Sequence, residues 1–129
     1  MDAAIQRIQP ADLPTPDGHY SHGTVAQGLV FVSGQLPVTP DGVRLVDAPL
    51  EVQARQVLAN VQAVLAAAGS SISRLVQVRV YVASVDHWPA FNAVYAEWAG
   101  ASRPARAVVP TGPLHHGLLV EVEAVALAP

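Results

Sequence analysis

The sequence predicts an α+β fold in which two helices cover one face of a β-sheet. Two segments carry apolar residues at the spacing of an amphipathic helix, and the segments around them are short and rich in Val and Leu. Gly and Pro occur along the whole chain without forming a linker. Residues 1–129 are therefore expected to make a single domain.

An irregular, proline-rich lead-in is expected at residues 10–18. The run at residues 25–33 predicts two short strands joined at residues 27–28, because a central Gly separates two Val-containing segments. Residues 40–42, with the sequence Pro-Asp-Gly, predict a tight turn, since Asp-Gly tolerates positive φ.

The clearest helix is expected over residues 48–68. Pro49 suits its first turn, and Gly69 supplies its end. The buried stripe should consist of Leu50, Ala54, Val57, Leu58, Val61, Val64, Leu65 and Ala68. The polar side chains, which include Gln53 and Asn60, are expected on the opposite side of the helix.

Residues 75–82 alternate as a strand. One face is expected to hold Val76, Val78, Val80 and Val82. A shorter helix is expected from about Asp86, the predicted N-cap, to Trp98. Residues 106–109 and 118–127 predict the last two strands. Because Leu and Phe also occur on the second face of the sheet, that face should be buried too, most economically against copies of the same chain.

Composition excludes several classes of protein. Hydrophobic residues make up 51% of the chain and charged residues 13%, which excludes a disordered chain. The net charge is −3, so a nucleic-acid partner is not expected. Without Lys or Cys, Schiff-base chemistry and thiolate chemistry are excluded. No apolar run is long enough to span a membrane and residues 1–10 do not resemble a signal peptide, so we expect a cytoplasmic protein with no membrane partner.

Two acidic residues near the carboxyl terminus are candidates for chemistry. Glu121 and Glu123 point to the same face of their strand, in an otherwise apolar segment. A carboxylate in apolar surroundings has a raised proton affinity and can act as an acid or base. The alternative is an edge strand whose charges prevent aggregation.

Arg106 is a candidate for binding a carboxylate, because its guanidinium can make two parallel hydrogen bonds to one. The alternative is a structural salt bridge to Glu121 or Glu123. His19, His22, His115 and His116 lie in loop-like segments, which disfavours a metal site. Ser33 lacks the GxSxG context of a serine nucleophile.

Several motifs follow one another along residues 18–126: Gly18-x-Tyr20-Ser21, the Phe31–Pro37 block, Gln53 to Asn60, Phe91-Asn92-x-x-Tyr95, Pro104-x-Arg106 and the Val120–Ala126 block. In this order and spacing they resemble the RidA/YjgF family, the reactive-intermediate imine deaminases. The resemblance implies a chorismate-mutase-like mixed β-sheet with two helices packed on one face. It also implies a homotrimer with active sites between subunits and no metal or other cofactor.

The family's activity is the hydrolysis of enamines or imines such as 2-aminoacrylate to 2-keto acids and ammonia. The resemblance therefore implies a hydrolase like the 2-iminobutanoate/2-iminopropanoate deaminases, in which Arg106 anchors the substrate carboxylate and Glu121 positions water. Tyr20, Ser33 and Asn92 match residues that line the cleft. The alternative is a non-catalytic binder or sensor of small carboxylates that uses the same cleft.

The chain departs from the family pattern beside Tyr20. His19 stands where the family usually has Pro, and His22 stands where it usually has Gln. Both histidines could add a titrating group to the cleft.

Overall fold

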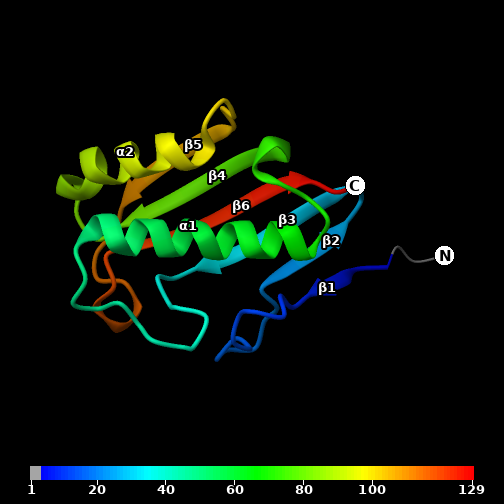
Figure 1. Ribbon diagram of the computed structural model, residues 1–129, viewed down its shortest axis with the longest axis horizontal. Coiled ribbons are helices and arrows are strands. Elements are labelled where there is room, and N and C mark those ends of the chain that lie inside the picture. The colour runs from blue at the N-terminus through cyan, green and yellow to red at the C-terminus, as the bar shows by residue number, and fades with distance from the viewer. Residues whose placement is uncertain (1–3) are drawn as a thin grey trace.

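Six β-strands form one sheet, and both long helices lie on the same face of it (Figure 1). The computed structural model describes residues 4–129. The strands are β1 (Gln6–Ile8), β2 (Gly23–Ala26), β3 (Leu29–Gln35), β4 (Leu75–Val82), β5 (Ala105–Pro110) and β6 (Val120–Leu127). They lie in the order β1-β2-β3-β6-β4-β5. β4 and β5 run parallel and the other neighbours are antiparallel, so the expected mixed sheet with two helices is confirmed.

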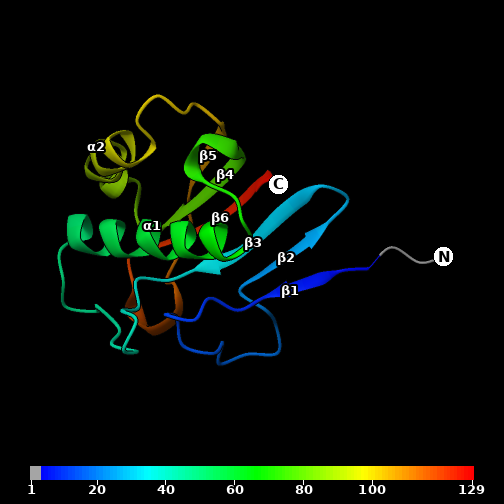
Figure 2. The same ribbon diagram turned by 45° about the vertical axis from the view of Figure 1, so that its right-hand side comes forward.

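The apolar core lies between the helices and the sheet. α1 (Leu50–Ala67) crosses β3 and β6, and α2 (Trp88–Ala99) lies beside α1 toward β5 (Figures 1 and 2). The whole predicted stripe of α1 is buried apart from Ala68, which follows the helix. Valines of the central strands meet it from the sheet, so the two periodicities of helix and strand build one core.

Backbone geometry sets the ends of α1. The helix begins at Leu50 rather than at the predicted Ala48, because Pro49 is extended with a ψ of 161°. The Pro49 carbonyl accepts hydrogen bonds from the backbone N–H groups of Val52 and Gln53. At the other end Gly69 has a φ of +77°, a conformation that favours glycine and ends the helix as predicted.

Two amides of α1 are buried, which corrects the prediction that they lie on the side of the helix opposite the buried stripe. Gln53 donates to the Ala48 carbonyl at 3.0 Å and accepts from the Leu119 N–H at 2.9 Å. Asn60 is buried in the same way, and its Nδ2 donates to two backbone carbonyls in the segment after β3. Both side chains satisfy backbone groups outside the sheet ladder, which makes polar side chains stable inside the core.

Three strand and cap predictions need correction. The register of β4 with β6 shifts between Leu75 and Gln77, so Val76 is exposed instead of joining the buried valine face. β1, which pairs with β2, was not predicted from the sequence. Asp86 is not the N-cap: α2 follows a short 3-10 turn, and the Ser84 hydroxyl accepts a hydrogen bond from the Asp86 N–H.

The two edges of the sheet differ. β1 and β2 extend past the helices on one side, whereas β5 forms the opposite edge (Figure 2). β6 lies between β3 and β4, so the interpretation of Glu121 and Glu123 as charges on an edge strand is wrong. The sheet face that neither helix covers is called the open face below.

Candidate functional site

A bulge in β3 shapes the open face beside β6. The pairing of the two strands advances three residues along β3 and two along β6 between Val32 and Gln35. A bulge turns an extra residue to one side of a sheet. Ser33 and Gly34 therefore both lie toward the open face, and Gln35 returns to the buried side.

Glu121 lies on the open face of β6 and contacts this bulge. A Cβ on Gly34 would overlap the Glu121 Oε2 atom, so glycine at this position leaves room for the carboxylate where it now lies. Burial raises the pKa of Glu121 above its ordinary 4.5, the charge of Glu123 raises it further, and the charge of His115 lowers it. The carboxyl group therefore binds a proton more readily than an exposed glutamate, as general acid–base chemistry requires.

Tyr20 approaches the same place from the segment before β2. Partial burial and the negative charges of Asp17 and Glu121 raise the pKa of Tyr20, so the phenol stays protonated at neutral pH and can donate a hydrogen bond. Tyr20 and Gly34 line one cavity of about 240 Å³, called the Tyr20 cavity below. Glu121, Gly34 and Tyr20 thus form one cluster beside the bulge of β3.

Ser33 is near this cluster, but its hydroxyl is already engaged. The Ser33 Oγ donates to the Ser21 carbonyl at 2.6 Å, and the Ser33 N–H donates to the His22 carbonyl at 2.9 Å. Ser33 therefore fixes the chain around Tyr20, and a remaining lone pair of its hydroxyl can still accept from a ligand.

Arg106 lies in a different environment. On β5 it pairs with the buried Val78, so its side chain points to the helix-covered side of the sheet. Its Nη1 donates to the Asn92 Oδ1 at 3.0 Å, and its guanidinium carbon lies 4.7 Å from the centre of the Tyr95 ring. Asn92 and Tyr95, both on α2, hold the guanidinium by a hydrogen bond and a cation–π contact.

The structure brings Arg106 together with Asn92, and Glu121 together with Tyr20, but it does not bring the two pairs together in one chain. Arg106 faces the helix-covered side of the sheet and Glu121 faces the open side. The salt bridge from Arg106 to Glu121 or Glu123, the alternative considered from sequence, does not form. Because β5 is an edge strand, Arg106 is nevertheless placed where a neighbouring molecule can approach.

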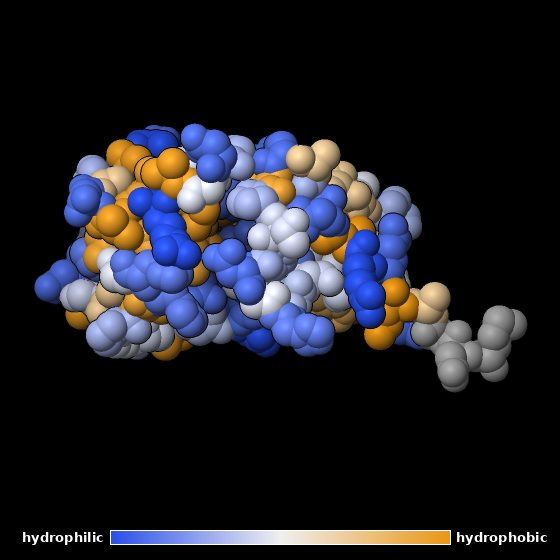
Figure 3. All heavy atoms as spheres, turned by 90° about the horizontal axis from the view of Figure 1, so that it is seen from below, coloured by the Kyte–Doolittle hydropathy of each residue, from blue (hydrophilic) through white to orange (hydrophobic). Residues whose placement is uncertain are grey.

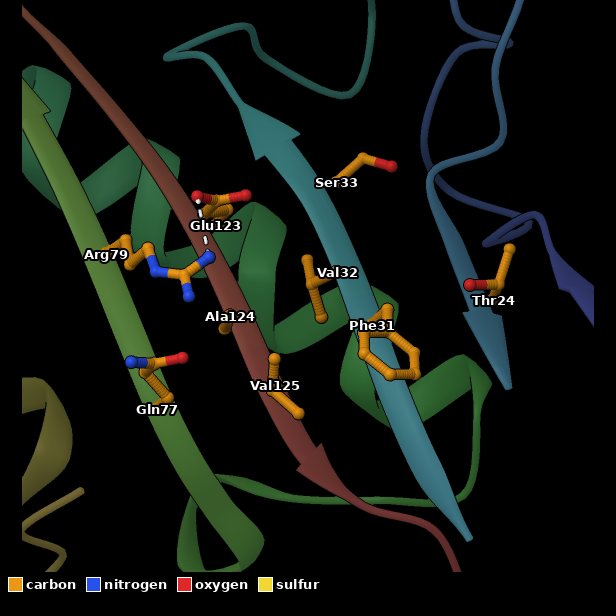
Figure 4. Close-up of a pocket in the computed structure, with 9 residues that line it drawn as sticks. All are labelled: Thr24, Phe31, Val32, Ser33, Gln77, Arg79, Glu123, Ala124 and Val125. Carbon is orange, nitrogen blue, oxygen red and sulfur yellow. Dashed lines mark ion pairs between the residues drawn. The ribbon is translucent and has the colours of Figure 1, made fainter. Parts of the chain in front are cut away.

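A second hollow on the open face carries an ion pair that sequence reasoning did not single out. Figure 4 shows Arg79 and Glu123 pointing toward each other across β4 and β6. The Arg79 Nη1 lies 3.6 Å from the Glu123 Oε1, and the Tyr81 hydroxyl donates to the same oxygen at 2.5 Å. This hydrogen bond raises the pKa of Tyr81. The available signal was the alternation of β4, which places Arg79 and Tyr81 on the same face as Glu123.

The histidines do not gather into one site. His22 is buried, its Nε2 lies 2.7 Å from the Pro14 carbonyl, and its Nδ1 lies 3.2 Å from the Gln35 amide nitrogen. His19, His115 and His116 are exposed, and His116 lines the Tyr20 cavity. Within residues 4–129, no three His, Asp or Glu side chains are grouped so that they could hold a metal ion.

The surface carries no broad apolar belt on the side seen in Figure 3, where polar and apolar side chains are interspersed. Among the described residues, no helix has the length and apolar character needed to cross a membrane.

A family model described as Endoribonuclease L-PSP matches residues 11–128 of this chain. The chain belongs to the YjgF/RidA family. The family therefore accounts for nearly the whole length of the chain, and the resemblance stated from the motifs is confirmed.

Named relatives of this YjgF/RidA protein come from distant organisms. Protein HMF1 of Saccharomyces cerevisiae is 40% identical over 113 residues, which is 88% of this chain and 87% of the relative. A goat protein (Capra hircus) named 2-iminobutanoate/2-iminopropanoate deaminase is 33% identical over 128 residues, 98% of this chain and 93% of the relative. The names differ in kind, so membership of the family does not by itself assign an activity to this chain.

Solved structures of the YjgF/RidA family share the fold. The crystal structure of E. coli TdcF with bound serine superimposes with a TM-score of 0.88 at 30% identity, covering 96% of this chain and 99% of that one. The fold expected from the family resemblance is therefore confirmed.

Proposed function

We propose that this protein hydrolyses imines and enamines of small amino acids, such as 2-aminoacrylate, to 2-keto acids and ammonia. The observation that carries the proposal is the held but unpaired guanidinium of Arg106. Within residues 4–129 its only hydrogen-bond partner is the uncharged amide of Asn92. A cation without a carboxylate partner, fixed by an amide and an aromatic ring, is suited to binding the carboxylate of a ligand.

Two relatives support a ligand of this kind. The goat relative is named as a deaminase of 2-imino acids, and TdcF was solved with bound serine, an amino acid. The imino acids in the first name and the serine in the second are small molecules with a carboxylate next to the carbon that carries nitrogen.

Glu121 supplies the second function. Water attacks the iminium carbon and loses a proton to the Glu121 carboxylate, which forms a carbinolamine. The same proton then returns to nitrogen, the C–N bond breaks, and the Glu121 carboxylate takes the hydroxyl proton as the carbonyl forms and passes it to the departing ammonia, which leaves as ammonium. A carboxyl group with a raised pKa can serve both steps, as base and then as acid.

The site is proposed to form between neighbouring copies in a homotrimer. In one chain Arg106 and Glu121 face opposite sides of the sheet, so one substrate can meet both only if they come from two chains. The open face also exposes Phe31, with an exposed fraction of 43%, and Leu127, with 46%. Covering these side chains with a second copy would remove apolar surface from water.

The decisive experiment mixes two inactive variants. Arg106→Ala and Glu121→Gln are purified, unfolded together and refolded at equal amounts. If Arg106 and Glu121 come from different chains of a cyclic trimer, about one quarter of the sites in the mixture regain both residues. We expect about that fraction of wild-type 2-keto acid formation, with 2-aminoacrylate generated from serine by a pyridoxal-dependent dehydratase.

Controls separate the possible outcomes. Arg103→Ala removes an exposed arginine three residues from Arg106 and should keep wild-type activity and oligomeric state. A mixture no more active than buffer would refute the shared site. Wild-type protein that binds pyruvate saturably but does not accelerate hydrolysis would leave a non-catalytic binder or sensor. RNA cleavage that survives Arg106→Ala would favour the nuclease activity named in the family description.

A further inference from the structure

His22 links two walls of the proposed site through both of its ring nitrogens. Its side chain is buried, with an exposed fraction of 9%. The Nε2 atom lies 2.7 Å from the Pro14 carbonyl, which can only accept, so Nε2 carries the proton. The Nδ1 atom lies 3.2 Å from the Gln35 Nε2, which can only donate, so Nδ1 is bare. The imidazole is therefore neutral in this arrangement.

Gln35 carries the connection into the bulge of β3. Its Nε2 group also donates to the Ser33 carbonyl at 3.1 Å. Because a bulge disrupts the sheet ladder locally, this donor serves a carbonyl in the disrupted stretch. The hydrogen bonds from Pro14 through His22 and Gln35 to Ser33 are called the His22–Gln35 bridge below.

The His22–Gln35 bridge fixes two parts of the site against each other. On one side it holds residues 13–20, the segment that ends in Tyr20 and lines the Tyr20 cavity. On the other side it holds Ser33 and Gly34, the bulge that contacts the Glu121 carboxylate. The bridge therefore adds to the two hydrogen bonds by which Ser33 holds the backbone of Ser21 and His22, and it helps to set the separation of Tyr20 and Glu121.

We propose that His22 is a positioning residue of the site, and that gain of a second ring proton turns the Gln35 amide, removes its hydrogen bond to the Ser33 carbonyl and lowers turnover. A protonated ring donates from both nitrogens, so its Nδ1–H would face the Gln35 NH₂ group. The Gln35 amide must then turn its oxygen toward His22, which leaves the Ser33 carbonyl without that donor. A glutamine at position 22 could donate a hydrogen bond to the Pro14 carbonyl and accept one from the Gln35 amide without gaining or losing a proton. The histidine therefore adds pH sensitivity to hydrogen bonds that an amide can also make.

Apart from the oxygen of a turned Gln35 amide, the groups around His22 are already engaged or uncharged. The titratable groups that share the Tyr20 cavity with His22 are Asp17, Tyr20, Arg44 and His116. Asp17 already lies 3.5 Å from the Arg44 guanidinium. β3 presents the uncharged Gln35, and α1 presents the uncharged Asn60, whose Nδ2 is bonded to two carbonyls. The turned Gln35 amide oxygen is therefore the acceptor that protonation requires, and the hydrogen bond from Gln35 to the Ser33 carbonyl is the part of the bridge that breaks.

The first test compares His22→Gln with the wild type across pH, and its activity readout rests on the proposed function. At pH 8 both proteins should have the same kcat/KM within about twofold. At pH 5.5 the wild type should be slower than His22→Gln by about tenfold, the effect of losing one hydrogen bond. His19→Gln, which changes an exposed histidine three positions earlier, should keep the wild-type profile. Parallel profiles of wild type and His22→Gln would overturn the proposal.

The second test needs no turnover and so separates failure of this proposal from failure of the proposed function. Nitrogen-15 NMR of the wild-type ring at pH 7.5 should show the Nε2–H tautomer. The amide exchange of Ser33, corrected for intrinsic rates, should become faster at pH 5.5 in the wild type and stay constant in His22→Gln. An Nδ1–H tautomer, or a Ser33 amide with the same pH response in both proteins, would refute the bridge. If His22→Gln does not fold, the tautomer and the wild-type exchange data still decide.

Discussion

The two faces of the sheet follow different rules. The helix-covered face is apolar almost throughout, and its central valines are fully buried, among them Val78, Val80 and Val122. The open face places Arg79, Glu121 and Glu123 among apolar side chains such as Phe31 and Leu127. The helices of one chain bury the first face, whereas the second face has charged groups and apolar area that remain uncovered in a single chain.

This difference indicates where functional residues are to be expected in the molecule. Burial in the core is sufficient to account for the apolar side chains on the helix-covered face. Arg106 is the exception on that face, since its guanidinium meets an amide and an aromatic ring instead of a carboxylate. The exception and the open face together supply the two halves of the proposed site.

The largest expected effect is on the core. Leu58→Ala should lower the free energy of unfolding by about 2–5 kcal/mol, because the side chain is fully buried under the sheet. Leu127→Ala makes the same chemical change on the open face, where the side chain is 46% exposed in one chain, and it should cost less than Leu58→Ala because only the proposed contact with a second copy would bury it further. Urea unfolding at one protein concentration measures both. Equal losses would show that the two faces are buried alike.

Glu121→Gln should lower kcat by about a hundredfold, which is the usual size of an acid–base contribution. The wild-type rate should rise with pH through a pKa above 4.5, because burial raises the pKa of this carboxyl group and hydrolysis starts from the carboxylate. The pH dependence of kcat for 2-aminoacrylate measures this limb. A wild-type rate that is flat from pH 4.5 to 8 would contradict the role of Glu121.

The same raised pKa fixes the sign of a stability change. The folded protein binds the Glu121 proton more tightly than the unfolded chain does, so the contribution of this group is present below pH 4.5 and is lost as pH rises through its folded pKa. Glu121→Gln should therefore be at least as stable as the wild type at pH 7.5. Thermal unfolding at pH 7.5 tests this, and a clearly less stable variant would show that the carboxylate is stabilised in the fold.

How far the sequence predicted these features depends on how local each one is. The apolar stripe of α1 was predicted correctly except for Ala68, because the spacing of apolar residues along one helix indicates which of them are buried. β1 was missed because only Ile8 of its three residues is apolar. The opposite orientations of Arg106 and Glu121 depend on the register of β5 against β4, which no local pattern encodes.

The bulge in β3 was invisible for a related reason. Simple alternation places Ser33 on one face and Gly34 on the other, whereas the extra residue turns both toward Glu121. The family motifs matched Tyr20, Ser33, Asn92, Arg106 and Glu121 to a site. The pairs that these residues form became visible only from the strand register and the hydrogen bonds.

Gly34→Ala should have a smaller effect, about tenfold in kcat/KM, because a displacement of the reacting groups weakens positioning. The new Cβ would overlap the Glu121 Oε2 and lie 3.2 Å from its Cδ, so the flexible carboxylate must move. Stability should change little. Gly112→Ala is the matched control, since a Cβ there meets nothing within 4 Å. Unchanged kinetics in Gly34→Ala would show that the position of the carboxylate is not critical.

Arg79→Ala should change activity and stability least, and it distinguishes the role of Arg79 from that of Arg106. Arg79 and Glu123 are 3.6 Å apart and their side chains are 51% and 33% exposed, so the pair should contribute less than about 1 kcal/mol to stability. Because Tyr81 also donates to Glu123, the carboxylate keeps a partner when Arg79 is removed. Arg79→Ala should therefore keep most of the activity that Arg106→Ala loses. Sedimentation velocity measures the oligomeric state of Arg79→Ala. Dissociation into monomers would mean that this ion pair is buried between copies. In that case charge, as well as apolar area, would stabilise the association of copies through the open face.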